Sequence, residues 1–413
     1  MALCGEGPLD IFKAAFDNGA LIRWLDYNDT WLAAEWGHPS DNFAGLLALG
    51  DWLCRNPGVL DGAGGAAVGD VLELAVKAYE IQGVLALANA FNRVGVDHVA
   101  LVKVANAALT ARLAGGGRAA VEQALAHSLI DGHSLRTYRH APNVAARKSW
   151  AAGDAAARGL RLGLMAARGQ LDPLPAPIAT PTWGMQDALL KGKPLVLAQP
   201  PGSYVIENIL YKVSFPAEFH AQTAAECALR LHEQAKGRLD EIAAIEVRTQ
   251  EAAVRIISKT GALRNYADRD HCLRYIIAVA LLEGKLEAKH YGDAYAKSRP
   301  EIEKLRAVTE VAEDPAYTEA YLDPARRAIP NAIRLRYADG SASDWVEEYY
   351  PLGHVRRRAE ALPALRAKFT AAAEPTLGTD RAAALLALFD EPARLDALAV
   401  SELVDLTRDA KAG

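Results

Sequence analysis

The first 170 or so residues repeat apolar side chains at the three- and four-residue spacing of an α-helix. Alanine, leucine and valine recur in this way in residues 42–55, 67–91, 98–114, 118–131 and 147–169. Clusters of glycine and proline separate these segments, and one of them is the run from Gly115 to Gly117. Arg118 follows that run, where a phosphate-binding loop would have Lys and then Ser or Thr, so the run is predicted to be a turn between helices. The chain is therefore predicted to begin with a large all-α domain.

The pattern changes after Trp183. Residues 242–249 alternate apolar and polar side chains, as a strand does. Residues 331–337 and 345–350 flank the turn residues Asp339 and Gly340, which is typical of a β-hairpin. Helices are expected between these strands, near residues 217–236 and 268–284, and again from about residue 356 onward.

These patterns together predict a mainly α fold with two domains. A chain of 413 residues exceeds what one hydrophobic core usually serves. We expect a helical domain in residues 1–205, a smaller inserted α+β domain in residues 206–352 that acts as a lid, and C-terminal helices in residues 353–413 that return to the helical domain.

Charge and hydropathy exclude several classes of partner. The formal net charge is -5, so the chain has no overall positive field for nucleic acid or an anionic membrane. No stretch approaches the ~20 apolar residues that a membrane span needs. The first residues, Met1 to Pro8, lack the basic and apolar regions of a secretion signal, so we expect a cytoplasmic protein. Any anion site must then be a local cluster of Arg, Lys and His.

The cysteines argue against a metal centre or a disulfide framework. They lie at Cys4, Cys54, Cys227 and Cys272, and none forms a C-x-x-C pair. An iron–sulfur hydratase needs three thiolates, commonly two of them close in sequence. The chain also lacks G-x-S-x-G, H-E-x-x-H, a P-loop and a dinucleotide-binding G-x-G-x-x-G. We expect no metal and no cofactor.

Four segments concentrate side chains that can carry chemistry. The first lies between two predicted helices, where Ser40 or Asp41 is expected to cap the second helix. Capping does not explain Asp26, Thr30 and His38 close by. A carboxylate, a hydroxyl and an imidazole near a helix start can bind and protonate an oxyanion.

The second and third segments add a histidine and a basic loop. His98 begins a predicted helix, a place where histidine is otherwise a surface or capping residue. The segment that follows the predicted helix at 118–131 and leads into the next one carries Arg136, Arg139, His140 and Lys148, with few acids to pair with them. A solvated basic loop is the structural alternative. Since arginine binds carboxylates through two parallel hydrogen bonds, a carboxylate site is the favoured interpretation.

The fourth segment places Lys212 just ahead of Pro216, which is expected to begin a helix. Lys212 could hold an ammonium at the rim of a pocket. Tyr275 follows the charged run from Asp268 to Cys272 that opens the next helix, and surface salt bridges are the structural alternative for that run.

At these segments the chain resembles the MmgE/PrpD family. The resemblance rests on residues 26–42, 91–98, 134–143, 147–155, 215–220 and 268–272, and extends from about Leu9 nearly to the end. It implies a large helical domain with a smaller α+β lid domain, a site in the cleft between them and a homodimer. Family members carry a further helical segment ahead of the position of Leu9, so we expect apolar surface of the helical domain to be exposed here.

The resemblance also implies an activity. It is the elimination of water from a small tricarboxylate without a metal, with 2-methylcitrate as the expected substrate in propionate catabolism and citrate as a further one. The pocket residues of a cis-aconitate decarboxylase in the same family fall on Asp26, Thr30, His38, His98, Lys148, Lys212 and Tyr275. The match at Lys212 requires a shift of one residue.

Roles follow from the chemistry of the elimination. His38 and His98 are expected to be the acid–base pair, with Asp26 orienting or replacing one of them. Arg136, Arg139, Lys148 and Lys212 are expected to hold the carboxylates, and His140, Thr30 and Tyr275 to contact the substrate. The sequence leaves open which histidine is the base. It also leaves two alternatives, a decarboxylase acting on cis-aconitate and an inactive paralogue that binds tricarboxylates.

Overall fold

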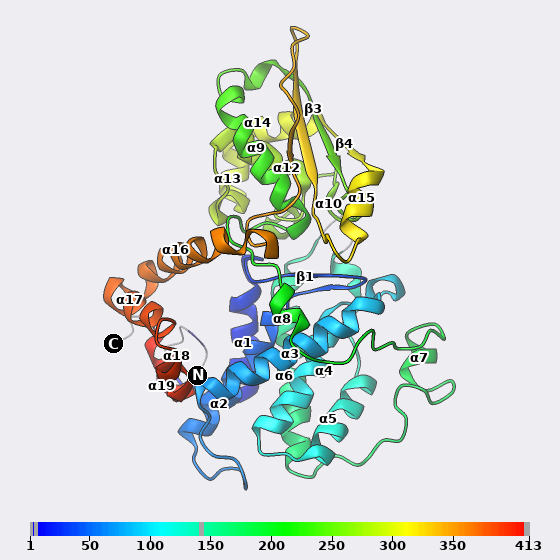
Figure 1. Cartoon of the computed structure of the whole chain (residues 1–413), viewed down its shortest axis with the longest axis vertical. Helices are drawn as coiled ribbons and strands as arrows, with labels where there is room; N and C mark the ends of the chain where they lie inside the picture. The colour runs from blue at the N-terminus through cyan, green and yellow to red at the C-terminus, as the bar shows by residue number, and fades with distance from the viewer. Residues whose placement is uncertain (1–2, 4–6, 140–143, 409–413) are drawn as a thin grey trace.

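The computed structural model describes residue 3 and residues 7–139 and 144–408. Helices dominate it, which confirms the mainly α expectation. Figure 1 shows an α-helical part and an α+β part at opposite ends of the long axis, with the C-terminal helices beside the helical part. Among the described residues, none of the helices combines the length and the apolar character needed to cross a bilayer. His140 lies outside the described residues.

The helical part contains the segments predicted from their periodicity. Its main helices are α1 (Ile11–Arg23), α2 (Phe43–Arg55), α3 (Val68–Ala88), α4 (Val99–Leu113), α5 (Arg118–Ile130) and α6 (Ala151–Ala167). Helix α4 lies at the centre and contacts α2, α3, α5 and α6. At Gly159 of α6, an added Cβ would lie 2.6 Å from the carbonyl oxygen of Lys103, so only glycine permits this close approach of the two helices. The short helices α7 (Met185–Ala188) and α8 (Tyr204–Asn208) follow.

The α+β part is built on a four-stranded sheet in the order β4-β3-β5-β6. The strands are β3 (Ile242–Thr249), β4 (Thr309–Glu313), β5 (Asn331–Tyr337) and β6 (Val346–Glu348). The predicted hairpin is confirmed, since β5 and β6 pair antiparallel with Asn331 opposite Glu348. The edge strand β4 was not predicted, and it pairs parallel to β3.

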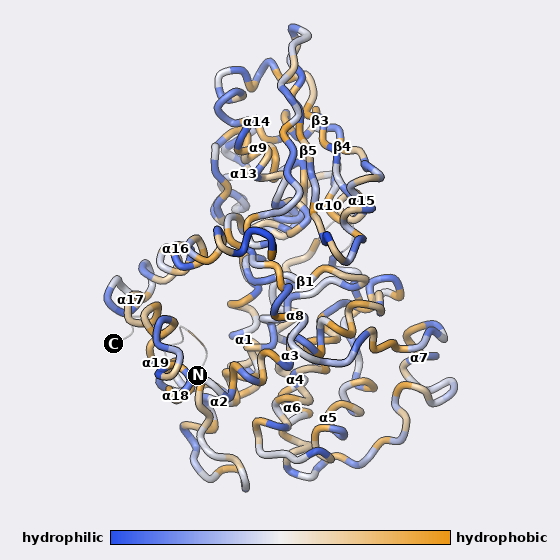
Figure 2. The backbone as a smooth tube through the Cα atoms, in the orientation of Figure 1, coloured by the Kyte–Doolittle hydropathy of each residue, from blue (hydrophilic) through white to orange (hydrophobic). Residues whose placement is uncertain are grey.

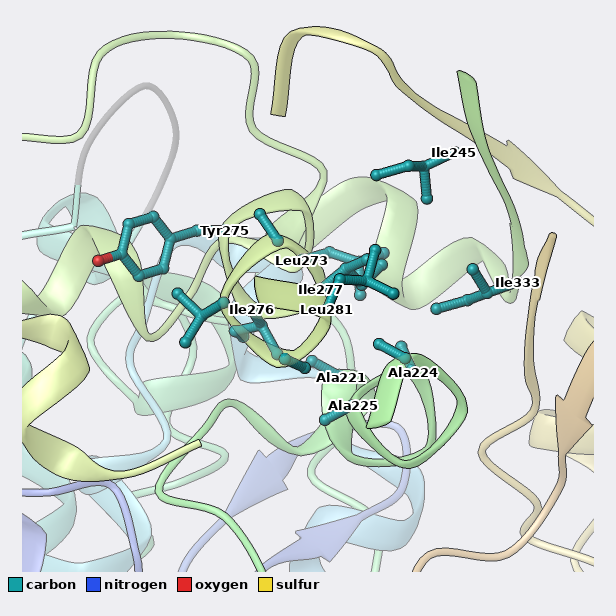
Figure 3. Close-up of a cluster of buried hydrophobic side chains, with 14 of the residues drawn as sticks. Ala221, Ala224, Ala225, Ile245, Leu273, Tyr275, Ile276, Ile277, Leu281 and Ile333 are labelled. Carbon is teal, nitrogen blue, oxygen red and sulfur yellow. The ribbon is translucent and has the colours of Figure 1, made fainter. Parts of the chain in front are cut away.

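Two long helices cover one face of this sheet. They are α9 (Gln222–Ala235) and α12 (Leu273–Glu283), both expected from the sequence. Figure 3 shows Ile277 of α12 and Ala224 of α9 on the side that faces Ile245 of β3 and Ile333 of β5. The remaining helices are α10 (Glu251–Ile257), α11 (Tyr266–Arg269), α13 (Asp293–Ser298), α14 (Pro300–Ala307) and α15 (Pro315–Leu322).

A small hairpin lies between the two parts. Its strands are β1 (Trp31–Leu32) and β2 (Trp36–Gly37), in a segment predicted only as a connection between helices. Figure 1 shows β1 between the helical part and the α+β part. The backbone of Thr30, just ahead of β1, pairs with Leu210 through two hydrogen bonds. This pairing brings the chain around residue 212 next to the hairpin.

The C-terminal helices are α16 (Arg358–Leu377), α17 (Thr379–Leu388), α18 (Pro392–Ala397) and α19 (Val400–Leu406). Helix α19 packs against α2, and α18 packs against α3. Leu21 of α1 and Trp24, the residue that follows this helix, are each about half exposed, at 53% and 52%. Figure 2 shows how apolar and polar residues are distributed along the backbone.

Candidate active site

A pocket forms where the β1–β2 hairpin meets the start of α4, the turn η3 (Arg136–Arg139) and the short helix η5 (Phe219–Ala221). Charged and imidazole side chains make up most of its lining. The described residues that line it are Arg23, Asp26, Thr30, Leu32, Trp36, His38, His98, Arg136, Arg139, Lys212, Glu218, Phe219, Ile256 and His271. Seven of the site residues expected from the sequence are among them.

Asp26 is at the centre of a buried cluster of cations. Its carboxylate lies 2.6 Å from an Nη of Arg23, and Lys212 Nζ donates to the Asp26 carbonyl oxygen at 2.6 Å and to its Oδ1 at 3.1 Å. Burial alone would raise the pKa of Asp26, but the neighbouring cations, Lys212 first among them, outweigh it and hold the pKa well below its usual range. Asp26 is therefore an anion. Its backbone has a left-handed φ of 48°, which is uncommon for a residue with a side chain.

Lys148 connects Asp26 to a second carboxylate. Its Nζ lies 2.7 Å from Asp270 Oδ2 and 3.7 Å from Asp26 Oδ2, and its side chain is buried. The other oxygen of Asp270 lies 2.6 Å from His271 Nδ1. Lys148 and His271 therefore belong to one polar cluster that adjoins the pocket. No role was predicted for Asp270 or His271, although both fall in the charged run from Asp268 to Cys272 that precedes Tyr275.

His38 has one ring nitrogen committed to the backbone. Its Nδ1 lies 2.6 Å from the carbonyl oxygen of Asp29 and 3.5 Å from Thr30 Oγ1. A carbonyl oxygen only accepts, so Nδ1 carries the proton and Nε2 keeps its lone pair. Burial, followed by the charge of Arg23, lowers the pKa of His38 well below its usual value. His38 is thus a neutral imidazole, and its basic Nε2 makes no hydrogen bond with any residue that the structure describes.

His98 faces His38 but has different neighbours. The two rings are 5.6 Å apart, centre to centre. His98 Nδ1 lies 3.4 Å from Asp97 Oδ1, and neither ring nitrogen makes a hydrogen bond among the described residues. Burial lowers the pKa of His98 well below its usual value, while Asp97 opposes that shift. The Asp97 carboxylate is the group that would stabilise a proton on His98.

Two arginines complete the cationic side of the pocket. Arg139 Nε donates to Asp97 Oδ2 at 2.7 Å, while Arg136 lies 3.6 Å from the same oxygen. The Arg136 guanidinium is also 5.2 Å from the ring centre of Trp36, and its Nη1 has no hydrogen-bond partner among the described residues. A buried guanidinium with an unused donor is suited to bind a carboxylate. Arg23, which the sequence did not single out, lines the same pocket.

Asp26, Asp270 and His271 also offer ligand atoms within 4.8 Å of one another. The ammonium of Lys148 lies against both carboxylates, and that of Lys212 lies against Asp26. A divalent ion there would meet strong repulsion from these charges. The donor arrangement therefore fits lysine pairing better than metal binding.

Two expectations about side chains differ from the structure. The Tyr275 hydroxyl donates to the carbonyl oxygen of His290 at 2.6 Å, and Tyr275 is not in the pocket lining. Figure 3 shows it on the side of α12 away from Ile245. The expected cap at Ser40 or Asp41 was wrong, because Ser40 Oγ donates to Asp29 and the residue that precedes α2 is Asn42.

Three apolar side chains form the remaining wall. Leu32 comes from β1, Phe219 from η5 and Ile256 from α10. Leu32 packs against the small cluster that contains Phe219. The pocket thus combines cations, two imidazoles and one apolar wall, which suits a polyanion that carries a small hydrocarbon group.

Comparison with known proteins agrees with the resemblance. Residues 3–198 match the MmgE/PrpD N-terminal domain, and residues 215–391 match the MmgE/PrpD C-terminal domain. The chain is 50% identical over 401 residues to a 2-methylcitrate dehydratase of Cupriavidus necator, with 96% of this chain and 82% of that protein covered. It is 49% identical to the 2-methylcitrate dehydratase of Escherichia coli (strain K12), with the same coverage. A mitochondrial 2-methylcitrate dehydratase of Yarrowia lipolytica is 50% identical, with 87% and 70% covered. The chain belongs to the MmgE/PrpD family.

Proposed function

We propose that this chain is a hydro-lyase that removes water from 2-methylcitrate to give 2-methyl-cis-aconitate, without a metal ion. The pairing of two neutral, buried histidines in a pocket lined by three arginines and Lys212 is the observation that carries the proposal. The identity of about half of all residues with 2-methylcitrate dehydratases of bacteria and a yeast supports the choice of substrate.

The cations supply the binding energy for three carboxylates. Arg136 has an unused donor, and Arg23, Arg139 and Lys212 line the same space. In a site closed to water, such charges interact with a carboxylate more strongly than they would in solution. Lys148 is not part of the pocket lining. Its ammonium lies beside the Asp26 carboxylate and helps to keep it ionised.

The two histidines divide the proton transfers. His38 is the base, because its Nδ1 proton is fixed by the Asp29 carbonyl and its Nε2 is free to accept. His98 is neutral in the free protein and becomes the acid when substrate carboxylates bind beside it, because their charges and the Asp97 carboxylate together stabilise the imidazolium.

The reaction follows from this division. His38 Nε2 takes the proton from the carbon that carries the methyl group, and the electrons of that C–H bond form the double bond. The neighbouring C–O bond breaks, and the hydroxyl leaves as water with the proton from His98. The cations hold the carboxylate next to the breaking C–H bond and stabilise the charge that develops on it.

The surrounding architecture fits the same proposal. We propose that the α+β part acts as a lid, since it contributes Glu218, Phe219 and His271 to the pocket and the helical part contributes the histidines 38 and 98. We further propose a homodimer in the cytoplasm.

Product analysis tests the activity. The purified chain is incubated with 2-methylcitrate, and the products are followed by ultraviolet absorbance of the conjugated alkene and by proton NMR. We expect reversible formation of 2-methyl-cis-aconitate without loss of carbon. Release of CO2 from cis-aconitate, with no alkene formed from 2-methylcitrate, would identify a decarboxylase instead.

A further inference from the structure

A second cavity is lined in part by Trp31 and Leu32 of the β1–β2 hairpin. Leu32 lines both spaces. We call this space the junction cavity and define it by Trp31, Tyr321 and the arginines 326, 327 and 356. Trp31 comes from the hairpin and Tyr321 from α15, while Arg326 and Arg327 follow α15 and Arg356 belongs to the short helix η8 (Val355–Arg357). The junction cavity therefore lies between segments far apart in sequence.

The lining of this cavity is positively charged. Its described lining residues include three arginines and one histidine and no aspartate or glutamate. None of the arginines 326, 327 and 356 makes an ion pair with any residue that the structure describes. Their neighbour Arg357 differs, because it pairs with Glu226 at 2.8 Å. An acidic residue therefore lies close enough to pair with Arg357, but no acidic residue that the structure describes lines the cavity.

Arg327 is held in an unusual position. Its backbone φ is 43°, a left-handed value that costs free energy for a residue with a side chain. The guanidinium lies 4.9 Å from the ring centre of Trp31 and 5.7 Å from that of Tyr204. One Nη donates to the Leu32 carbonyl oxygen at 3.0 Å, while the buried Nε has no partner among the described residues.

The electrostatics of the cavity agree with its composition. His354, which is 2% exposed, accepts a hydrogen bond from the Arg356 backbone at its Nδ1. Burial, followed by the charge of Arg356, lowers the pKa of His354 to about 4. His354 is therefore neutral at neutral pH and adds no charge to the cavity. The three guanidinium groups have no counter-ion among the described residues that line it.

We propose that the junction cavity is a second binding site, for a small molecule with phosphate or carboxylate groups. Guanidinium groups bind both kinds of anion through parallel hydrogen bonds. The ligand would contact the guanidinium groups of Arg326, Arg327 and Arg356, which line the cavity. The site is separate from the pocket of the proposed function and its occupancy does not depend on the reaction.

The junction cavity also has a direct connection to the candidate active site. Arg327 holds the carbonyl of Leu32, and the same hairpin segment carries Thr30, Trp36 and, just after β2, His38. An anion that fixes the Arg327 guanidinium therefore steadies the hairpin that lines the pocket. Occupancy of the junction cavity is expected to change turnover without entering the active site.

Binding is measured by isothermal titration calorimetry on the full chain at fixed ionic strength. Pyrophosphate is the phosphate-bearing probe, and tricarballylate, which has no hydroxyl to eliminate, is the carboxylate-bearing probe. The test variant is Arg326→Gln/Arg356→Gln, which breaks no ion pair. The control variant is Arg357→Gln, which removes a paired charge from the same turn.

We expect at least one of the two probes to lose one binding site, or at least tenfold in affinity at one site, in the double variant and not in Arg357→Gln. The probe that does so identifies the anion class. We also expect this probe to alter the kcat of the wild-type chain at saturating substrate at least twofold, and the double variant, with its basal kcat unchanged, to lose that response.

Identical isotherms for the wild-type chain and the double variant, with both probes, would overturn the proposal. A raised KM for substrate in the double variant without any lost anion site would also overturn it, since the arginines would then serve substrate entry. Because the titration needs no turnover, failure of the proposed dehydratase activity leaves this result readable.

Discussion

His38 Nδ1 lies 2.6 Å from the backbone carbonyl oxygen of Asp29, so this hydrogen bond fixes the tautomer of the imidazole. This tautomer supports our proposal that His38 is the base, a question that the sequence left open. We predict that His38→Gln and His98→Gln each lower kcat/KM for 2-methylcitrate by roughly 10²–10⁴, the usual contribution of a positioned acid or base. The control is His127→Gln, because this half-buried histidine lies within hydrogen-bonding distance of the Asp172 carbonyl oxygen and is absent from the pocket lining. Near-normal turnover in both site variants would contradict the assignment.

The lowered pKa of His38 determines how the rate is expected to depend on pH. Burial lowers the pKa of His38 below its usual value, so the base is already unprotonated at neutral pH. The acid limb of kcat/KM is therefore expected below about pH 6.5, the ordinary histidine value. An acid limb above that value would show that the base has a raised pKa and is a different group.

Asp26 is predicted to stabilise the fold as well as the site. The Asp26→Asn variant leaves Arg23 and Lys212 buried without their counter-charge, which costs about 3–5 kcal/mol in the free energy of unfolding. The pKa of Asp26 is lowered in the folded chain, so its contribution is present above the unfolded value of about 3.9 and is lost as the pH falls further. Urea unfolding at neutral pH measures the cost. The control is Asp17→Asn, which breaks a more exposed pair with Lys13 and should cost about 0–1 kcal/mol. Equal costs would contradict the role of burial.

Lys368 gives a pH dependence of the opposite sign. Its Nζ donates to the carbonyl oxygens of Tyr27 and Lys212, both at 2.7 Å, and so ties α16 to the two segments that carry Asp26 and Lys212. Burial, aided by the charge of Lys212, lowers the pKa of Lys368 to about 7. Between this pKa and the unfolded value of about 10.4, the unfolded chain binds more protons, so this group makes stability rise with pH.

The Lys368→Met variant is therefore predicted to lose that rise. Urea unfolding at pH 7 and pH 9 should show a smaller gain in stability for the variant than for the wild-type chain. Lys13→Met, an exposed lysine on α1, is the control and should keep the wild-type difference. A rise of unchanged size in Lys368→Met would show that another group titrates.

The apolar wall is predicted to select the methyl group of the substrate. That methyl lies on the carbon that loses its proton, so it enters the same pocket as the base, and Leu32, Phe219 and Ile256 are apolar residues that line this pocket. Loss of apolar contact with a methyl group costs about 1–3 kcal/mol. The Ile256→Ala variant should lower kcat/KM for 2-methylcitrate about tenfold relative to that for citrate. Its neighbour Val254, which is 36% exposed and outside the pocket lining, provides the control Val254→Ala. An unchanged ratio of the two substrates would remove Ile256 from the specificity wall.

Long, periodic elements could be predicted from the sequence. The predicted helix at 98–114 is α4 (Val99–Leu113), and the strand at 242–249 has the predicted bounds, because burial of one face imposes a regular pattern on the residues. Strand β4 was missed, since its five residues include two glutamates and alternate too briefly to give a signal. The β1–β2 hairpin was missed for the same reason, because each strand has only two residues.

The site residues were predictable mainly where chemistry and resemblance coincided. His38, His98 and Asp26 do line one pocket. Arg23 was not predicted because it ends an ordinary amphipathic helix. Asp270 and His271 were not predicted because a charged run at the start of a helix is usually a solvated face. Only tertiary contacts distinguish these cases. Tyr275 was expected at the site, and the fold instead directs its hydroxyl to the His290 carbonyl.

The central claim is that two histidines and a set of cations eliminate water without a metal. The most direct test is the rate of alkene formation from 2-methylcitrate by chain that has been treated with a chelator and analysed for residual metal. We predict the same kcat before and after treatment, with far less than one metal ion per chain. A rate that disappears on treatment and returns when iron or another divalent metal is restored would contradict the claim.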